Sequence, residues 1–235
     1  MKMRKLTLVL MICIISTVLL GNSQASYEGI LLKNYQNTSQ LKEILKLHSS
    51  EYMNEIIILP EEVFNEKEAA FIISNVQRLP DSLLVKIQQN NIHIKLFNGK
   101  LTDNPSADHL KGISPRGYTS NKKWDNVPGI GGGSTVLVKI GHSEKGMGHG
   151  SINLELHELA HSIDQIVFEK IRLDPLFLKI WSKEKNSLFA NQTYLTSLPE
   201  EYFAESFAMY YINEENKAIL KKRAPETYEY IKNLK

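Results

Sequence analysis

The sequence SINLELHELAHSIDQIVF at residues 151–168 predicts an amphipathic helix that packs against the core of the protein. Its apolar residues recur at helical spacing and form one stripe. The stripe consists of Leu156, Ala160, Ile163 and Val167. The two histidines of this stretch therefore sit on a helix that is held against a core.

Within this helix, residues 157–161 read His-Glu-Leu-Ala-His, the H-E-x-x-H pattern typical of zinc peptidases. His157 and His161 are four residues apart, so their imidazoles share a face and can bind one metal ion together. Glu158 follows the first histidine, where its carboxylate can act as a general base toward water. Two surface histidines with a solvated glutamate are the alternative, which the apolar stripe disfavours. The pattern predicts one Zn²⁺ per chain with an open coordination position.

A second helix is predicted to begin near residue 197. Ser197 and Glu200 have the spacing of a capping box, and Pro199 suits a first helical turn. The apolar residues that follow indicate a mostly buried helix, and they are Phe203, Phe207, Met209 and Tyr210.

Glu201 and Glu205 lie four residues apart on this second helix, so they share a face. Two carboxylates on a buried helix are costly unless they are paired or bound to a metal. Glu201 as the third zinc ligand and Glu205 as the partner of a ligand histidine would remove that cost. The alternative is that both carboxylates face water on the polar side of the helix.

The first 25 residues have the pattern of a signal peptide. Basic residues precede an apolar run over residues 6–20, which is short for a membrane span. Residues 23–25 read Ser-Gln-Ala and resemble a cleavage site, so we predict cleavage after Ala25 and secretion. Cys13 lies in the apolar run after the bulky Ile12, which argues against a lipid-attachment site.

The chain after residue 25 contains no cysteine, because Cys13 is the one cysteine of the sequence. Disulfides, a thiol nucleophile and a cysteine-ligated metal are therefore excluded from the secreted part. Loss of Lys2, Arg4 and Lys5 lowers the formal charge from +2 to −1, which is not the profile of a nucleic-acid-binding protein. We expect a monomeric bacterial exported protein without a membrane segment after cleavage.

Hydrophobic periodicity predicts helices at residues 39–52, 62–78 and 80–90, and strands at 55–59, 92–97 and 134–140. Residues 102–133 lack periodicity and contain several glycines and prolines, so they are predicted to form a long functional loop. No linker is visible. We predict a single α+β domain over residues 26–235, with a small mixed sheet, a zincin-type active-site helix and a mostly helical C-terminal part.

Three further polar residues near the H-E-x-x-H pattern have open roles. His142 and His149 flank a glycine-rich turn, and we interpret them as loop residues because three zinc ligands are already assigned. Asp164 follows His161 by three residues and is either a partner of a ligand histidine or a helix-surface aspartate.

Four stretches carry a resemblance to a known family: Trp-Asp-Asn-Val-Pro-Gly at 124–129, Gly-Gly-Ser-Thr at 132–135, Ile-Asn-Leu-Glu-Leu-His-Glu at 152–158 and Pro-Glu-Glu-Tyr-Phe-Ala-Glu-Ser-Phe at 199–207. Together they closely resemble the secreted bacterial Pro-Pro endopeptidases, which are related to the catalytic domain of anthrax lethal factor. The resemblance extends from about residue 55 to the C-terminus.

The resemblance implies a zinc endopeptidase that cuts between two prolines in extended segments of surface or adhesion proteins. It implies that His157, His161 and Glu201 bind zinc and that Glu158 is the base. Tyr194 matches the family tyrosine seven residues before the ligand glutamate, and would donate a hydrogen bond to the developing oxyanion.

The same resemblance implies that Trp124 lines the cleft and that Lys122 and Glu200 link a loop to the cleft wall. The turn Gly133-Ser134-Thr135 precedes the strand expected to pair with substrate. In one departure from the family, this turn reads Gly-Gly-Gly-Ser-Thr at 131–135 and is one glycine longer.

Two other hypotheses follow from the same residues. The first is a lethal-factor-like toxin that cleaves a host protein, which the absence of room for a delivery domain disfavours. The second is a secreted binding module whose metal site serves stability alone. Glu158 and Tyr194 argue against the second, because a structural metal site needs neither.

Overall fold

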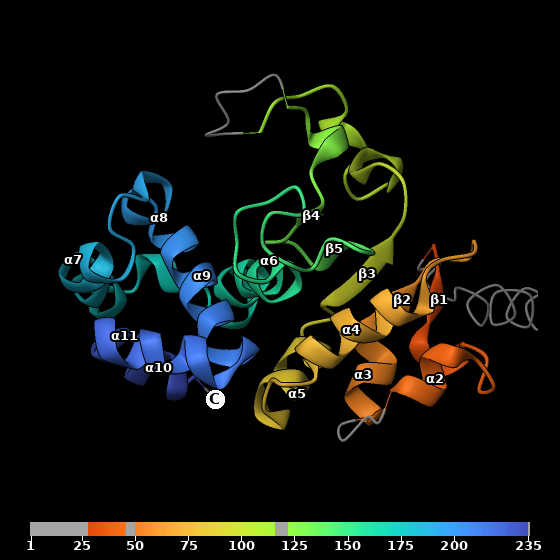
Figure 1. The fold of residues 1–235 in the computed structure, drawn as a ribbon, viewed down its shortest axis with the longest axis horizontal. Helices are drawn as coiled ribbons and strands as arrows, with labels where there is room; N and C mark the ends of the chain where they lie inside the picture. The colour runs from red at the N-terminus through yellow and green to blue at the C-terminus, as the bar shows by residue number, and fades with distance from the viewer. Residues whose placement is uncertain (1–27, 46–49, 116–121, 235) are drawn as a thin grey trace, which may run out of the picture.

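We describe the protein from a computed structural model that covers residues 28–45, 50–115 and 122–234 (Figure 1). The predicted signal segment at residues 1–25 lies outside these ranges. In the described part of the chain, no helix combines the length and the apolar character that crossing a membrane requires.

The described residues form one five-stranded mixed sheet with the strand order β1-β2-β3-β5-β4. The strands are β1 (Ile30–Leu31), β2 (Ile57–Leu59), β3 (His93–Phe97), β4 (Gly129–Ile130) and β5 (Thr135–Lys139). The central strands β2, β3 and β5 run parallel, whereas the edge strands β1 and β4 are antiparallel to their neighbours. The sheet confirms the predicted α+β class with a small mixed sheet.

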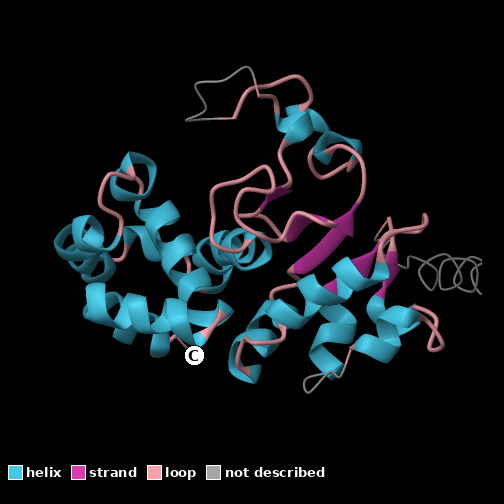
Figure 2. Cartoon of the chain, in the orientation of Figure 1, coloured by secondary structure: helices cyan, strands magenta, loops and turns pink. Residues whose placement is uncertain are grey.

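Four helices of the N-terminal half cover this sheet (Figure 2). They are α2 (Gln40–Ile44), α3 (Ser50–Ile56), α4 (Glu66–Val76) and α5 (Asp81–Gln89). α4 begins after Asn65, whose side chain accepts hydrogen bonds from the N–H groups of Lys67 and Glu68. α4 packs against α2 and also against α6 (Leu154–Ser162), and thereby connects the N-terminal helices to the helix that carries both histidines.

The C-terminal half consists of helices, as predicted. α6 continues into a π-helical turn, Ile163–Val167, and a 3-10 turn at Ile171–Leu173 precedes the remaining helices. These are α7 (Pro175–Leu188), α8 (Thr193–Ser197), α9 (Pro199–Ile212), α10 (Glu214–Arg223) and α11 (Pro225–Lys232). α6 lies between the sheet and this helical group, and it packs closely against α9 (Figure 1).

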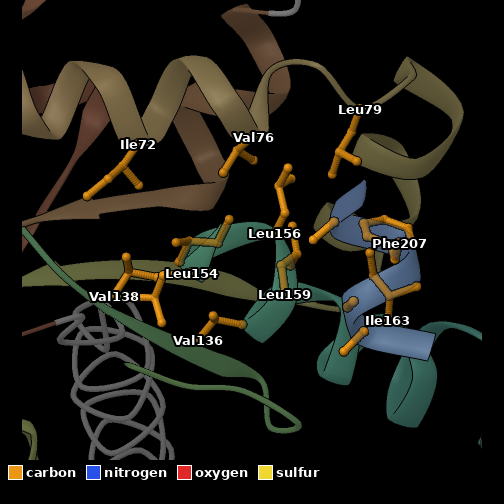
Figure 3. Close-up of a cluster of buried hydrophobic side chains, with 14 of the residues drawn as sticks. Ile72, Val76, Leu79, Val136, Val138, Leu154, Leu156, Leu159, Ile163 and Phe207 are labelled. Carbon is orange, nitrogen blue, oxygen red and sulfur yellow. The ribbon is translucent and has the colours of Figure 1, made fainter. Parts of the chain in front are cut away.

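The main core lies where α4, β5, α6 and α9 meet (Figure 3). Leu156 and Leu159 of α6 point between Val76 of α4 and Phe207 of α9, and all four side chains are fully buried. Leu156, Ala160 and Ile163 are inaccessible to solvent, and Val167 is partly buried, which confirms the predicted apolar stripe. Burial of each such side chain contributes about 1.5–3 kcal/mol to folding, so the histidine-bearing helix is firmly held.

A buried polar network fixes the start of α6. The Glu155 carboxylate is inaccessible to solvent and accepts hydrogen bonds from Asn75 Nδ2 at 2.7 Å, Ser143 Oγ at 2.6 Å and Asn153 Nδ2 at 2.8 Å. Burial raises the pKa of Glu155. Asn153 Oδ1 accepts the Leu156 N–H, so the helix begins at Leu154, three residues later than the predicted start at 151.

Two other predictions about local structure are wrong. Ser197 does not cap the second helix, because it ends the short helix α8, and Leu198 stands at the N-cap of α9 without a side-chain hydrogen bond. Pro199 does occupy the first turn. The predicted loop at 102–133 contains strand β4, which pairs with Leu137 and Val138 of β5, together with 3-10 turns.

Candidate metal centre and active-site cleft

Three side chains from α6 and α9 converge on one point. His157 Nε2 lies 3.3 Å from His161 Nε2 and 3.3 Å from Glu201 Oε2, and His161 Nε2 lies 3.5 Å from the same carboxylate oxygen. They form the one group of three or more His, Cys, Asp or Glu side chains, among the described residues, whose donor atoms are close enough to hold a metal ion. His142 and His149 are not part of it.

The donor set fits a zinc ion. A tetrahedral zinc site with bond lengths of about 2.0–2.2 Å places neighbouring donor atoms about 3.3 Å apart. The triangle of His157, His161 and Glu201 has edges of 3.3, 3.3 and 3.5 Å. Two imidazoles and one carboxylate, with a fourth position toward the cleft, are the ligand set of many hydrolytic zinc sites.

The electrostatics of the triangle favour a cation. Burial favours the neutral imidazole of His157, but hydrogen bonds with Glu201 and Glu205 and the charges of Glu158 and Glu205 outweigh it and raise the pKa of His157 to about 10. Burial likewise opposes the charge of Glu201, but both imidazoles hold the pKa of its carboxyl well below the usual range. A carboxylate therefore persists here at neutral pH, ready to bind positive charge.

Glu205 orients His157 through Nδ1, the ring nitrogen that lies outside the triangle. Its Oε2 lies 3.1 Å from His157 Nδ1, and its Oε1 accepts the Ile152 N–H at 2.9 Å. A proton on Nδ1 that faces Glu205 orients the ring so that Nε2 points into the triangle. The structure thus places Glu205 where the sequence predicted the carboxylate partner of a ligand histidine.

Glu158 lines the same cleft from the helix that carries the histidines. Burial raises the pKa of Glu158, although the imidazoles of His157 and His161 and a hydrogen bond with the Gly131 backbone lower it. A carboxylate with a raised pKa beside a metal position suits a group that takes up a proton and gives it back.

Tyr194 contacts the metal triangle directly. Its hydroxyl donates to Glu201 Oε1 at 2.6 Å, and 45% of the residue is exposed. The structure therefore places the Tyr194 hydroxyl beside the triangle, with its O–H directed at the carboxylate of Glu201.

These side chains open into a cleft of about 630 Å³. The residues that line it include Trp124, Glu200, Gly131 and Gly132. Gly133, Ser134 and Thr135 are not among the lining residues, and they continue the turn into β5. Trp124 is half-buried, because it also packs against a small second core. That core consists of Phe97, Leu101, Ala107, Val127 and Leu137.

Lys122 contacts the glycine-rich turn that precedes α6. Its Nζ donates to the backbone carbonyl of Gly148, in the glycine-rich turn before α6. Glu200 lies at the start of α9. Lys122 thus connects the residues just before Trp124 to the turn that precedes α6.

Several residues of the site were missed at the level of sequence. Ser162 Oγ donates to Gly133 O at 2.8 Å and accepts the Gly132 N–H at 3.0 Å, which attaches the β4–β5 turn to α6. Asp164 is fully buried and pairs with Arg172, so it is not a helix-surface aspartate. Asn153 carries a helix-cap signal that could have been found, whereas Ser162 and Arg172 carry none.

The β4–β5 turn approaches the backbone of α6 so closely that only glycine fits at residue 131. A Cβ atom on Gly131 would lie 1.8 Å from the carbonyl oxygen of Glu158. We expect Gly131→Ala to lower the free energy of unfolding by about 3 kcal/mol, since either strand or helix must shift. Gly133→Ala is the matched control, because its nearest neighbours are 3.9 Å away. Thermal unfolding of both variants measures the difference, and equal melting temperatures would contradict the close approach.

Comparison with known proteins places these features in context. Residues 43–234 match the family model described as anthrax toxin lethal factor, N- and C-terminal domain. A Pro-Pro endopeptidase of Clostridioides difficile is 44% identical over 183 residues, which are 77% of this chain and 82% of that protein. A Pro-Pro endopeptidase of Paenibacillus alvei is 35% identical over 183 residues, which are 77% of this chain and 84% of that protein.

The fold agrees with the same relatives. The solved structure of the Pro-Pro endopeptidase from Paenibacillus alvei superimposes with a TM-score of 0.74 at 34% sequence identity. The match covers 78% of this chain and 100% of that structure.

Proposed function

The chain belongs to the Pro-Pro endopeptidases, a family of lethal-factor-like proteases, and we propose that it is a zinc endopeptidase that hydrolyses the bond between two prolines. The observation that carries this proposal is the triangle of His157, His161 and Glu201, which opens with Glu158 into one cleft. The proposed substrates are extended, proline-rich segments of secreted surface or adhesion proteins.

The proposal assigns a role to each residue at the metal position. His157, His161 and Glu201 would hold the zinc ion, and Glu205 orients His157 through its Nδ1 atom. A bound zinc ion would act as a Lewis acid that activates water and polarises the scissile carbonyl. Glu158 accepts the proton of the attacking water and delivers it to the nitrogen of the departing proline.

The hydroxyl of Tyr194 would stabilise the negative charge that develops on the carbonyl oxygen. In the structure this hydroxyl donates to Glu201 Oε1. During the reaction it would release the Glu201 carboxylate and donate to the oxyanion instead. Half of Tyr194 is exposed, which leaves room for the side chain to rotate within the cleft. A donor that meets the oxyanion only as charge develops lowers the barrier without tightening substrate binding.

Proline-flanked bonds demand recognition by shape. Proline has no N–H and cannot complete a strand ladder with the cleft edge. Its fixed φ angle favours the extended polyproline conformation, which aromatic and apolar walls recognise by ring contact. Trp124 and Ile130 face the cleft and supply such walls.

We further propose that the protein is secreted after cleavage near Ala25. The rest of the chain would then act as one monomeric domain with one zinc ion. The signal pattern at residues 1–25 and the absence of cysteine after Cys13 support an exported, disulfide-free enzyme.

The experiment that tests the proposed function follows cleavage of a Pro-Pro peptide while zinc is removed and restored. We expect a chelator to abolish cleavage and added zinc to restore it, with full activity at one zinc per chain. Cleavage that persists in the metal-free protein, or that needs two ions per chain, would contradict the assignment.

Tyr194→Phe is expected to lower kcat by about 10²-fold or more with little change in KM, because the hydroxyl acts on the transition state. Zinc content should stay at one per chain, since Tyr194 is not among the three proposed ligands. Steady-state kinetics with a Pro-Pro peptide provide the measurement. Tyr211→Phe, a tyrosine outside the cleft-lining residues, is the control. A kcat close to that of the unmodified protein would remove Tyr194 from the mechanism.

A further inference from the structure

An ion pair joins the wall of the cleft to the turn that follows α6, the helix that carries both histidines. Asp164 lies in the π-helical turn after α6, and Arg172 lies in the 3-10 turn Ile171–Leu173. The Arg172 N–H donates to Asp164 Oδ1 at 2.8 Å, and Arg172 Nη1 lies 3.0 Å from Asp164 Oδ2. The backbone of Arg172 is therefore hydrogen-bonded to Asp164, and its guanidinium forms an ion pair with the same carboxylate without hydrogen-bond geometry at Oδ2.

The two ends of this pair face different surroundings. The side chain of Asp164 is 0% exposed, whereas that of Arg172 is 26% exposed and lines the cleft. The negative end is thus buried and the positive end is turned toward the substrate space. A guanidinium carries five N–H donors in a planar fork, so the contact through Nη1 leaves further donors that can bind two oxygens of an anion.

Arg172 is the only lysine or arginine among the described residues that line the cleft. The acidic side chains there are Glu158, Glu200, Glu201 and Glu205. Glu201 and Glu205 are engaged with imidazoles, and the proposed zinc ion adds further positive charge near Glu158. Among the described residues of this wall, Arg172 is thus the one permanently cationic side chain that an incoming carboxylate meets.

We propose that Arg172 is a specificity-determining residue that binds the carboxylate of an aspartate or glutamate close to the Pro-Pro bond of the substrate. The inference rests on the proposed function, because it names a substrate feature for the same cleft. A backbone carbonyl of the peptide is the alternative ligand, but it offers one oxygen and no net charge. A carboxylate matches both the geometry and the charge of the guanidinium.

The test uses peptides with a central Pro-Pro pair. In each peptide, glutamate or its uncharged isostere glutamine occupies one of the three flanking positions on either side of the pair. We expect kcat/KM for glutamate to exceed that for glutamine about tenfold at one of these positions, as a charge-assisted contact predicts. In Arg172→Gln this ratio is expected to fall to about one, and in Arg172→Glu a lysine peptide is preferred at the same position. Lys179→Gln removes an exposed positive charge of α7 and is expected to keep the ratio of the unmodified protein.

Three outcomes would overturn the inference. One is equal cleavage of glutamate and glutamine peptides at every position. Another is a uniform loss with all peptides in Arg172→Gln, together with a lower melting temperature, which would mean that the ion pair only holds the fold. If no Pro-Pro peptide is cleaved at all, the proposed function fails and this inference fails with it. The first of these outcomes, with cuts still between prolines, would overturn the role of Arg172 alone.

Discussion

Glu158→Gln is expected to lower kcat for a Pro-Pro peptide at least about a thousandfold while the protein still binds one zinc ion. Glutamine has nearly the same shape as glutamate but cannot accept the proton of the attacking water. Glu158 is not part of the donor triangle, which is formed by His157, His161 and Glu201, so metal binding should persist. Metal analysis and steady-state kinetics on the same sample separate the two effects.

The control for this variant removes a carboxylate that lies outside the cleft. Glu144 is exposed in the turn before α6, and we expect Glu144→Gln to be as active as the unmodified protein. Substantial activity in Glu158→Gln would mean that another group takes the proton. Loss of zinc from Glu158→Gln would instead mean that the ligand set is incorrectly assigned.

His161→Ala is expected to lose both zinc and activity, because two donors from one α6 face are needed to hold the ion with Glu201. The clearest signal is in thermal unfolding. A metal that binds only the folded state stabilises it by about 4 kcal/mol when its concentration is a thousand times the dissociation constant. Added zinc should therefore raise the melting temperature of the unmodified protein and leave that of His161→Ala unchanged.

His109→Ala is the matched control, since His109 is an exposed histidine outside the triangle. It should respond to zinc as the unmodified protein does. Zinc stabilisation that survives in His161→Ala would contradict the three-ligand site. A zinc response that is absent from all three proteins would show that zinc is not the metal of this site.

The local part of the metal site could be predicted from sequence, because its geometry follows from helical spacing. His157 and His161 share a face wherever the helix lies, and the apolar stripe fixed which face is buried. Glu201 was predicted from the cost of a buried carboxylate, and α6 and α9 do pack together with Glu201 between the two imidazoles.

The remaining features depend on tertiary contacts that carry no periodic signal. Asn75 and Glu155 are 80 residues apart, and their hydrogen bond requires α4 to pack on α6. β4 has two residues and is held by backbone pairing with β5, so no alternation marks it. The Ser197 cap was predicted wrongly because its residue type fits a cap, yet the preceding short helix extends through it.

The preference for proline pairs is the central claim, and mapping of cleavage sites in a peptide library tests it most directly. The library holds Pro-Pro, Pro-Ala, Ala-Pro and Ala-Ala at its centre and varies the flanking residues, and mass spectrometry identifies each cut. We predict that cuts fall between the two prolines and that the three alanine-containing sets remain intact in the presence of zinc. Cuts at other bonds, or equal cleavage of Ala-Ala peptides, would contradict the account.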